Sequence, residues 1–291
     1  MTQLNSSIDF YNKHFFFILG SPRSGTKWFS TFFTTEKVFC FHELTLYCHG
    51  NVESHVKAIK EYIPIKGDIL ESTLHRFFKL YPLFGKYLYQ KLEENSNFVA
   101  CGNSDCAIMH IAPALHQIFP NSKYLIILRN GFDVALSLEQ KMKEHSKTLE
   151  NGIEYYNDWL KANGLLVKCK DYFEIACWRW RAYTEKLINN YKVLSKERTL
   201  LVSFEKTFKD INNLNYIWDY LLNKKVPFDS KRAEMLLTKQ INKGKHDNLI
   251  GTKIKERWSE LDSSRKDIFV NIAGSLINKL PFYEEWPDLD F

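Results

Sequence analysis

The chain has 291 residues, of which 45% are hydrophobic and 15% aromatic, and a formal net charge of +6. This composition suits a buried core and excludes a disordered chain. Its 34 acidic residues are interspersed with the basic ones, which favours a local anion site over a nucleic-acid-binding surface. The first residues do not resemble a signal peptide and no 18-residue apolar segment follows, so we expect a cytoplasmic protein with no nucleic-acid or membrane partner and with reduced cysteines.

Five short segments rich in β-forming residues recur between helical patterns along the chain. Three of them are continuously apolar, as strands covered by helices on both faces must be. Helical patterns follow the first segment, at 25–35, and precede the fourth, at 107–119. Such alternation predicts a single α/β domain over 1–291, with a central, mostly parallel sheet flanked by helices. The expected strands are 15–19, 38–41, 98–101, 124–128 and 199–204.

Two longer segments interrupt this alternation. Residues 50–97 are rich in aromatic side chains and residues 139–170 are charged. We expect both to be helical excursions that build an acceptor pocket at the edge of the core. A further helix is expected at 171–191, where large apolar side chains lie near one helical face. Most of the aromatic residues in these segments are expected to be core residues.

The first strand leads into a glycine loop, GSPRSGTKW, from Gly20 to Trp28. Its glycines have the spacing of a nucleotide-phosphate loop, but the lysine is displaced by one place, so Lys27 stands where a magnesium-binding hydroxyl is usual. Backbone N–H groups of such a loop, with the start of the helix, bind an anion. The guanidinium of Arg23 can bind phosphate or sulfate oxygens from within the loop. A donor that needs less charge neutralisation than ATP, and no metal, therefore fits this loop.

The other residues of the loop carry further expectations. Ser24 and Thr26 offer hydroxyl donors, and Gly25 completes the glycine spacing. Lys27 either contributes charge to the transferred group or points to solvent. Trp28, one turn into the helix, either stacks on a nucleotide base or is a core residue.

Two segments of the sequence resemble motifs of one enzyme family. SPRSGTKW resembles the 5′-phosphosulfate loop of the sulfotransferases that use 3′-phosphoadenosine 5′-phosphosulfate (PAPS). LIILRNGFDVALSL resembles the family's 3′-phosphate motif, which here comprises Arg129, Asp133 with the valine after it, and Ser137. An arginine at a strand's end and a serine eight residues on can bind the same phosphate. The resemblance implies a P-loop-like sulfotransferase core with PAPS as co-substrate.

Two later segments are weaker matches to the same family. LLVSFEKTF resembles a strand that ends in an aromatic-Glu pair, which would put Phe204 near the adenine. Residues 242–258 resemble the late loop that closes on the 3′-phosphate, although Trp258 follows the glycine at a longer distance than in the family. A solvated lysine-rich loop explains each of its candidates equally well. These candidates are Lys243, Gly244, Lys245 and Arg257.

The acceptor's proton needs a base, and the expected second strand is followed by His42 and Glu43. The resemblance favours Glu43, which matches the glutamate of the tyrosylprotein and related bacterial sulfotransferases. His42 is the alternative, because its ordinary pKa suits the role. Asp105, after the third strand, has no assigned role, since Ser104 and Cys106 stand where related enzymes often carry lysine and proline.

We therefore expect sulfuryl transfer to a hydroxyl, amine or guanidine nitrogen of a small molecule, natural products among the candidates. The rivals are a metal-dependent P-loop kinase and a nucleotide-binding protein of the same fold that has lost its base. A kinase predicts an aspartate at a strand end, where the fourth strand is followed by Arg129 instead. The sequence does not indicate an oligomeric state.

Two clusters of side chains carry weaker hypotheses. Acidic residues such as Glu150, Glu154 and Asp158 either attract a cationic acceptor or lie on an exposed helix face. No metal site is expected, because the C-x-H-x₅-C-H spacing matches no standard zinc arrangement. The residues with this spacing are Cys40, His42, Cys48 and His49.

Overall fold

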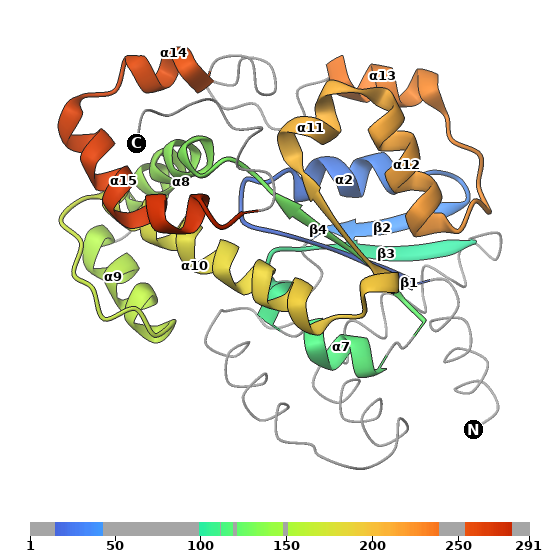
Figure 1. The fold of residues 1–291 in the computed structure, drawn as a ribbon, viewed down its shortest axis with the longest axis horizontal. Coiled ribbons are helices and arrows are strands. Elements are labelled where there is room, and N and C mark those ends of the chain that lie inside the picture. Colours follow the sequence, from blue (N-terminus) through green and yellow to red (C-terminus); the bar gives the residue numbers. More distant parts are fainter. Residues whose placement is uncertain are drawn as a thin grey trace.

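A computed structural model of the chain describes residues 15–42, 99–110, 112–118, 121–147, 151–238 and 254–280. Its centre is one five-stranded sheet with the order β2-β3-β1-β4-β5, in which every pairing is parallel (Figure 1). The five expected strands are all present, so the predicted α/β fold with a parallel sheet is confirmed. The strands are β1 (Phe15–Gly20), β2 (Val38–His42), β3 (Ala100–Ser104), β4 (Lys123–Leu128) and β5 (Thr199–Ser203).

The central strand β1 contributes to two separate cores. Successive side chains of a strand point to opposite faces of the sheet. Phe15, Phe17 and Leu19 accordingly pack into one cluster of buried residues, and Phe16 and Ile18 into the other. Every residue of β1 is buried. This burial explains why the run is continuously apolar, as expected for a strand covered on both faces.

Helices cover each face of the sheet (Figure 1). One face carries α2 (Thr26–Phe33), α11 (Phe204–Lys209), α12 (Ile211–Leu222) and α13 (Ser230–Thr238). The other carries α7 (Ala112–Ile118), α8 (Gly131–Ser146), α10 (Tyr172–Val193) and α15 (Ser263–Ile277). The shorter elements are α9 (Gly152–Ala162), α14 (Ile254–Ser259) and the 3-10 helices η1 (Ala107–His110) and η2 (Lys196–Arg198).

The helix predictions are mostly confirmed, with two differences. The expected helix at 107–119 is divided into η1 and α7, because Pro113 favours the first turn of a new helix over the middle of a continuous one. The expected excursion at 139–170 is helical only in part, since α9 ends at Ala162 and is soon followed by Gly164, which has a left-handed backbone with φ of 85°. The excursion at 50–97 lies outside the described residues. None of the described helices is both long and apolar enough to cross a membrane.

Helix α13 holds the end of α2 in place. The guanidinium of Arg232 donates three hydrogen bonds, of 2.5 to 2.8 Å, to carbonyl oxygens at the end of α2. The last carbonyls of a helix have no intrahelical partner, so this arginine satisfies groups that would otherwise need water. The accepting residues are Thr31, Phe32 and Thr34.

Candidate active site

The loop between β1 and α2 has a backbone suited to an anion. Gly25 is the residue before the first turn of α2, with φ of 90°, and Arg23 also has a left-handed backbone, with φ of 71°. As a glycine, this N-cap residue has no side chain with which to cap α2. Since the first N–H groups of a helix have no intrahelical partner, the start of α2 presents donors and a partial positive charge.

Phe204 packs directly against this loop. It follows β5, is 5% exposed, and its ring lies so close to Gly25 that a β-carbon there would be 2.7 Å from Phe204 Cε2. The guanidinium of Arg129 lies over the same ring, 4.4 Å from its centroid. The predicted site residue Phe204 therefore connects the loop to Arg129, while its contact with an adenine stays a prediction.

Arg23, Arg129 and Ser137 come together although they belong to motifs more than a hundred residues apart. Nε of Arg23 donates to Oγ of Ser137 at 2.7 Å, and Nη1 of Arg129 donates to the carbonyl oxygen of Arg23 at 2.5 Å. The reason is topological: β1 and β4 are neighbouring parallel strands, so the segments that follow them begin at the same edge of the sheet. The two motifs that carried the family resemblance thus form one site.

A buried carboxylate links two of the predicted arginines. Asp133 is 2% exposed. Its Oδ2 lies 3.6 Å from Nη2 of Arg129, and its Oδ1 lies 3.0 Å from Nη1 of Arg257, as an ion pair without the alignment of a hydrogen bond. Nε of Arg129 and Nδ2 of Asn130 are buried donors that have no hydrogen-bond partner among the described residues. This donor set fits the oxygens of a phosphate.

The backbone around Arg129 is held by residues that the sequence analysis did not single out. Trp180 donates from Nε1 to the carbonyl oxygen of Arg129 at 3.2 Å. Glu205 accepts a hydrogen bond of 2.8 Å from the N–H of Asn130, whose own side chain accepts from Phe132 and so caps α8. Burial raises the pKa of Glu205, against the lowering effects of the Asn130 N–H and the charge of Arg129. Glu205 was detectable as the second member of the aromatic-Glu pair, whereas Trp180 carried no signal beyond its place on an apolar helix face.

The ends of β2 and β3 lie beside the start of α2. His42 is in register with Ser104, whose hydroxyl donates to the carbonyl oxygen of Thr26 at 2.8 Å. The base candidate His42 is thereby at the same edge of the sheet as the loop. Asp105 is fully buried and accepts from the N–H of Ala107 at 2.7 Å, which gives this aspartate a structural part at the start of η1.

The environments of Ser24, Trp28 and Lys27 can be compared with the roles expected of these residues in nucleotide binding. The hydroxyl of Ser24 is buried and donates to the carbonyl of Ser21 at 2.6 Å, so it is used within the loop, because a buried hydroxyl must find a partner. Trp28 is 6% exposed and stacks on Phe32 with ring centroids 4.9 Å apart, which favours the core alternative over base stacking. Lys27 is exposed, as in the solvent-facing alternative.

Several predicted residues lie outside the described part of the chain. Among the described residues, no group of three or more histidines, cysteines, aspartates or glutamates could hold a metal ion. Glu154 and Asp158 are exposed on α9, as the helix-face alternative predicts. The residues outside the described part are Glu43, Cys48, His49, Glu150, Lys243, Gly244 and Lys245.

The fold is shared with solved sulfotransferase structures. A sulfotransferase domain from the curacin biosynthetic pathway is 20% identical, with a TM-score of 0.50 over 91% of this chain and 97% of that one. A sulfotransferase domain from the Synechococcus PCC 7002 olefin synthase is 16% identical, with a TM-score of 0.51 over 92% of this chain and 96% of that one. No protein-family model and no curated protein sequence matches the chain. At these identities the likeness establishes the fold, and the chain has the sulfotransferase fold that its motifs predicted.

Proposed function

We propose that the chain is a PAPS-dependent sulfotransferase that moves a sulfuryl group to a hydroxyl or nitrogen of a small-molecule acceptor. The observation that carries the proposal is the contact of Arg23 with Ser137 and Arg129, which unites the two motifs expected to hold the two phosphates of one nucleotide. The sulfotransferase fold supports the same conclusion.

Each part of the site has a role in this proposal. The loop and the start of α2, with Arg23, would hold the 5′-phosphosulfate. Arg129, Ser137 and Arg257 would bind the 3′-phosphate, and the buried donors of Arg129 and Asn130 have hydrogen-bonding capacity for it. PAPS supplies the activated sulfuryl group. Lys243, Gly244 and Lys245 are proposed to close on the same phosphate.

The acceptor must lose a proton as its oxygen or nitrogen bonds to sulfur and the bond from sulfur to the phosphate oxygen breaks. Glu43 is the proposed base, with His42 as the alternative; His42 is the last residue of β2, whose end lies beside the loop, and Glu43 is the next residue in the sequence. Alanine substitution of each, in a turnover assay with an acceptor found by screening with labelled donor, tests this step. If neither substitution lowers turnover, both base assignments are wrong.

Nucleotide binding tests the proposal without knowledge of the acceptor. The product nucleotide 3′-phosphoadenosine 5′-phosphate (PAP), adenosine 5′-phosphate and ATP with Mg²⁺ are compared by thermal unfolding, each with and without a chelator. PAP at a hundred times its Kd should stabilise the fold by about 2.7 kcal/mol, regardless of chelator. Stronger stabilisation by ATP with Mg²⁺, lost with chelator, would instead favour the P-loop kinase.

The same measurement on a matched pair of variants tests the site. PAP should stabilise wild type more than adenosine 5′-phosphate does, because only PAP carries the 3′-phosphate. Arg129→Gln should remove this difference in stabilisation. Lys141→Gln, which removes an exposed charge from α8, should leave it unchanged. An Arg129→Gln variant that still prefers PAP would contradict the assignment of the 3′-phosphate site.

A further inference from the structure

Arg179, on α10, is half-buried in a cluster of aromatic rings. Its guanidinium carbon lies 4.6 Å from the ring centroid of Trp159, 5.6 Å from that of Tyr156 and 6.0 Å from that of Tyr183. Two of these rings come from α9 and one from α10. We call these four residues the Arg179 cluster. The faces of aromatic rings stabilise a cation, but they do not replace the pair of hydrogen bonds that a carboxylate accepts from a guanidinium.

Arg179 differs from the other arginines of its neighbourhood in having no carboxylate partner among the described residues. Its Nε is buried and has no hydrogen-bond partner within the part of the chain that the structure describes. Arg181, two residues on, pairs with Glu185 at 3.0 Å, and Arg265 pairs with Glu139. The charge of Arg179 and a side-chain hydrogen bond act on the Tyr183 hydroxyl, which is no anion, so this half-buried guanidinium keeps capacity for an anion.

The Arg179 cluster lies close to the proposed transfer site. Trp180, the next residue, donates to the carbonyl oxygen of Arg129, so this part of α10 contacts the segment that follows β4. Tyr183 interacts electrostatically with Asp105 and Cys106, which directly follow β3. Figure 1 shows the first half of α10 on the side of the molecule where β4 ends and α8 begins. A group bound by Arg179 would therefore stand near the edge of the sheet that carries the loop.

We propose that the Arg179 cluster is a subsite for a carboxylate group of the acceptor. The planar guanidinium can bind both oxygens of a carboxylate, and the surrounding rings contact the adjoining apolar part of the same molecule. The inference rests on the proposed function, since it names the class of acceptor that the transferase would use. It replaces the cationic acceptor suggested by the acidic residues of α9, because Glu154 and Asp158 are exposed to solvent.

The experiment compares hydroxy acids with their primary amides, which have nearly the same shape and no charge. Two pairs serve as probes: para-hydroxyphenylacetate and beta-hydroxybutyrate, each with its amide. Binding is measured by isothermal titration calorimetry, with and without PAP. At least one acid should bind the wild-type protein about tenfold more tightly than its amide, the difference expected for charge-assisted hydrogen bonds.

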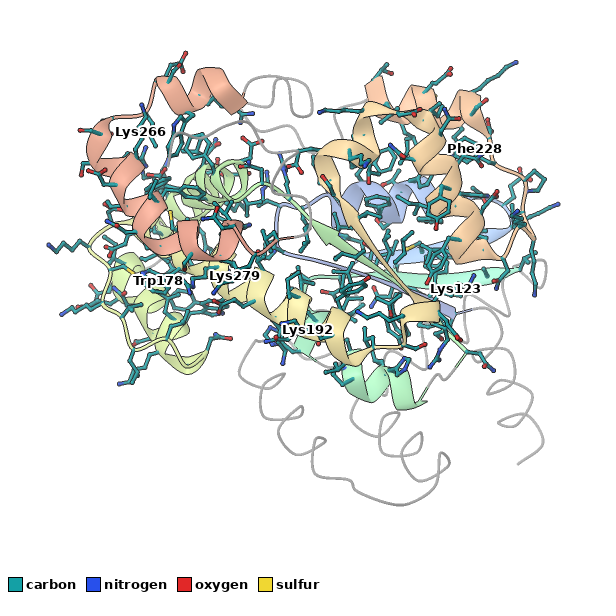
Figure 2. All side chains as sticks on the ribbon, viewed as in Figure 1. Lys123, Trp178, Lys192, Phe228, Lys266 and Lys279 are labelled. Carbon is teal, nitrogen blue, oxygen red and sulfur yellow. The ribbon has the colours of Figure 1, made fainter. Side chains whose placement is uncertain are left out.

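Three variants assign this preference to Arg179. Arg179→Gln should weaken the acid about tenfold and leave the amide unchanged. Arg179→Lys keeps the charge without the planar fork and should retain part of the preference. Lys192→Gln removes an exposed cation from the last turn of the same helix and should behave as wild type; Figure 2 labels Lys192 toward the opposite end of α10 from Trp178.

Several outcomes would overturn the subsite. They are the absence of saturable binding by either acid, equal affinity for acid and amide, and an acid preference that survives in Arg179→Gln. Stabilisation by PAP is recorded for every variant and shows that each one is folded. If the wild-type protein does not bind PAP, the proposed function is contradicted. If it binds PAP but does not prefer the acids over their amides, only the subsite is contradicted.

Discussion

Replacing Gly25 by alanine should damage both the fold and the proposed nucleotide site. Gly25 has φ of 90°, a conformation that costs a residue with a β-carbon about 1 to 2 kcal/mol. The new β-carbon would also lie 2.7 Å from Phe204 Cε2 and 3.2 Å from Cδ2. Phe204 has little room to move, because its ring centroid lies 4.5 Å from that of Phe208 and 4.4 Å from the guanidinium carbon of Arg129.

The two effects have separate magnitudes. Forcing an extra methyl group into a packed site costs about 1 to 3 kcal/mol, so Gly25→Ala should lose roughly 2 to 5 kcal/mol in the free energy of unfolding. Gly164 is a matched control: its φ is 85° and no atom of the described residues lies within 4 Å of a β-carbon built there. Gly164→Ala should therefore lose only the backbone part, about 1 to 2 kcal/mol.

Thermal unfolding and calorimetric titration with PAP measure the outcome. At about 2 °C for each kcal/mol, Gly164→Ala should lower the Tm by about 2 to 4 °C and Gly25→Ala by about 4 to 10 °C. A displaced Phe204 also moves Arg129, so Gly25→Ala should weaken PAP at least about tenfold, or 1.4 kcal/mol, whereas Gly164→Ala should bind PAP normally. Equal losses of Tm in the two variants, or unchanged PAP affinity in Gly25→Ala, would refute this reasoning.

Three further substitutions test residues that support the site. Asp133→Asn removes the carboxylate that two guanidiniums share, so the free energy of unfolding of the ligand-free protein should fall by about 3 to 5 kcal/mol. PAP should then stabilise this variant more than it stabilises wild type. Arg232→Ala removes the cap of α2 and should cost about 1.5 to 3 kcal/mol, with the exposed Lys231→Ala as control. Burial raises the pKa of Glu205, so the folded chain prefers the protonated acid; wild type should lose stability relative to Glu205→Gln as the pH rises above the ordinary value of 4.5.

Thermal unfolding with and without PAP checks the first two substitutions, and unfolding across a pH series checks the third. An Asp133→Asn protein with wild-type Tm and PAP response would show that the carboxylate does not organise the arginines. Identical behaviour of Arg232→Ala and Lys231→Ala would mean that the cap of α2 contributes nothing. A difference between wild type and Glu205→Gln that is constant with pH would exclude Glu205 as a buried, titrating group.

The strands and the loop were predictable because their determinants are local. The apolar run at 15–19 is typical of a strand buried on both faces, and the glycine spacing from Gly20 to Gly25, directly after it, is typical of a phosphate loop. Arg129 and Ser137 were detectable for the same reason, since both lie in one short segment that resembles a family motif, with Arg129 directly after β4 and Ser137 in α8. Pro113 shows the limit of such reading, because a single proline changed one expected helix into two elements.

The sequence by itself determined the strands, the glycine loop and the two motifs that resemble those of the sulfotransferases, each from a pattern shorter than twenty residues. Only the tertiary structure decided which side chains meet: Arg23 with Ser137, Asp133 with Arg257, and Arg179 with the rings of α9. It also decided that Trp28 belongs to the core. The physical reason is that these contacts depend on the parallel order of strands and on helix packing, which bring together residues whose distance along the chain carries no information about their distance in space.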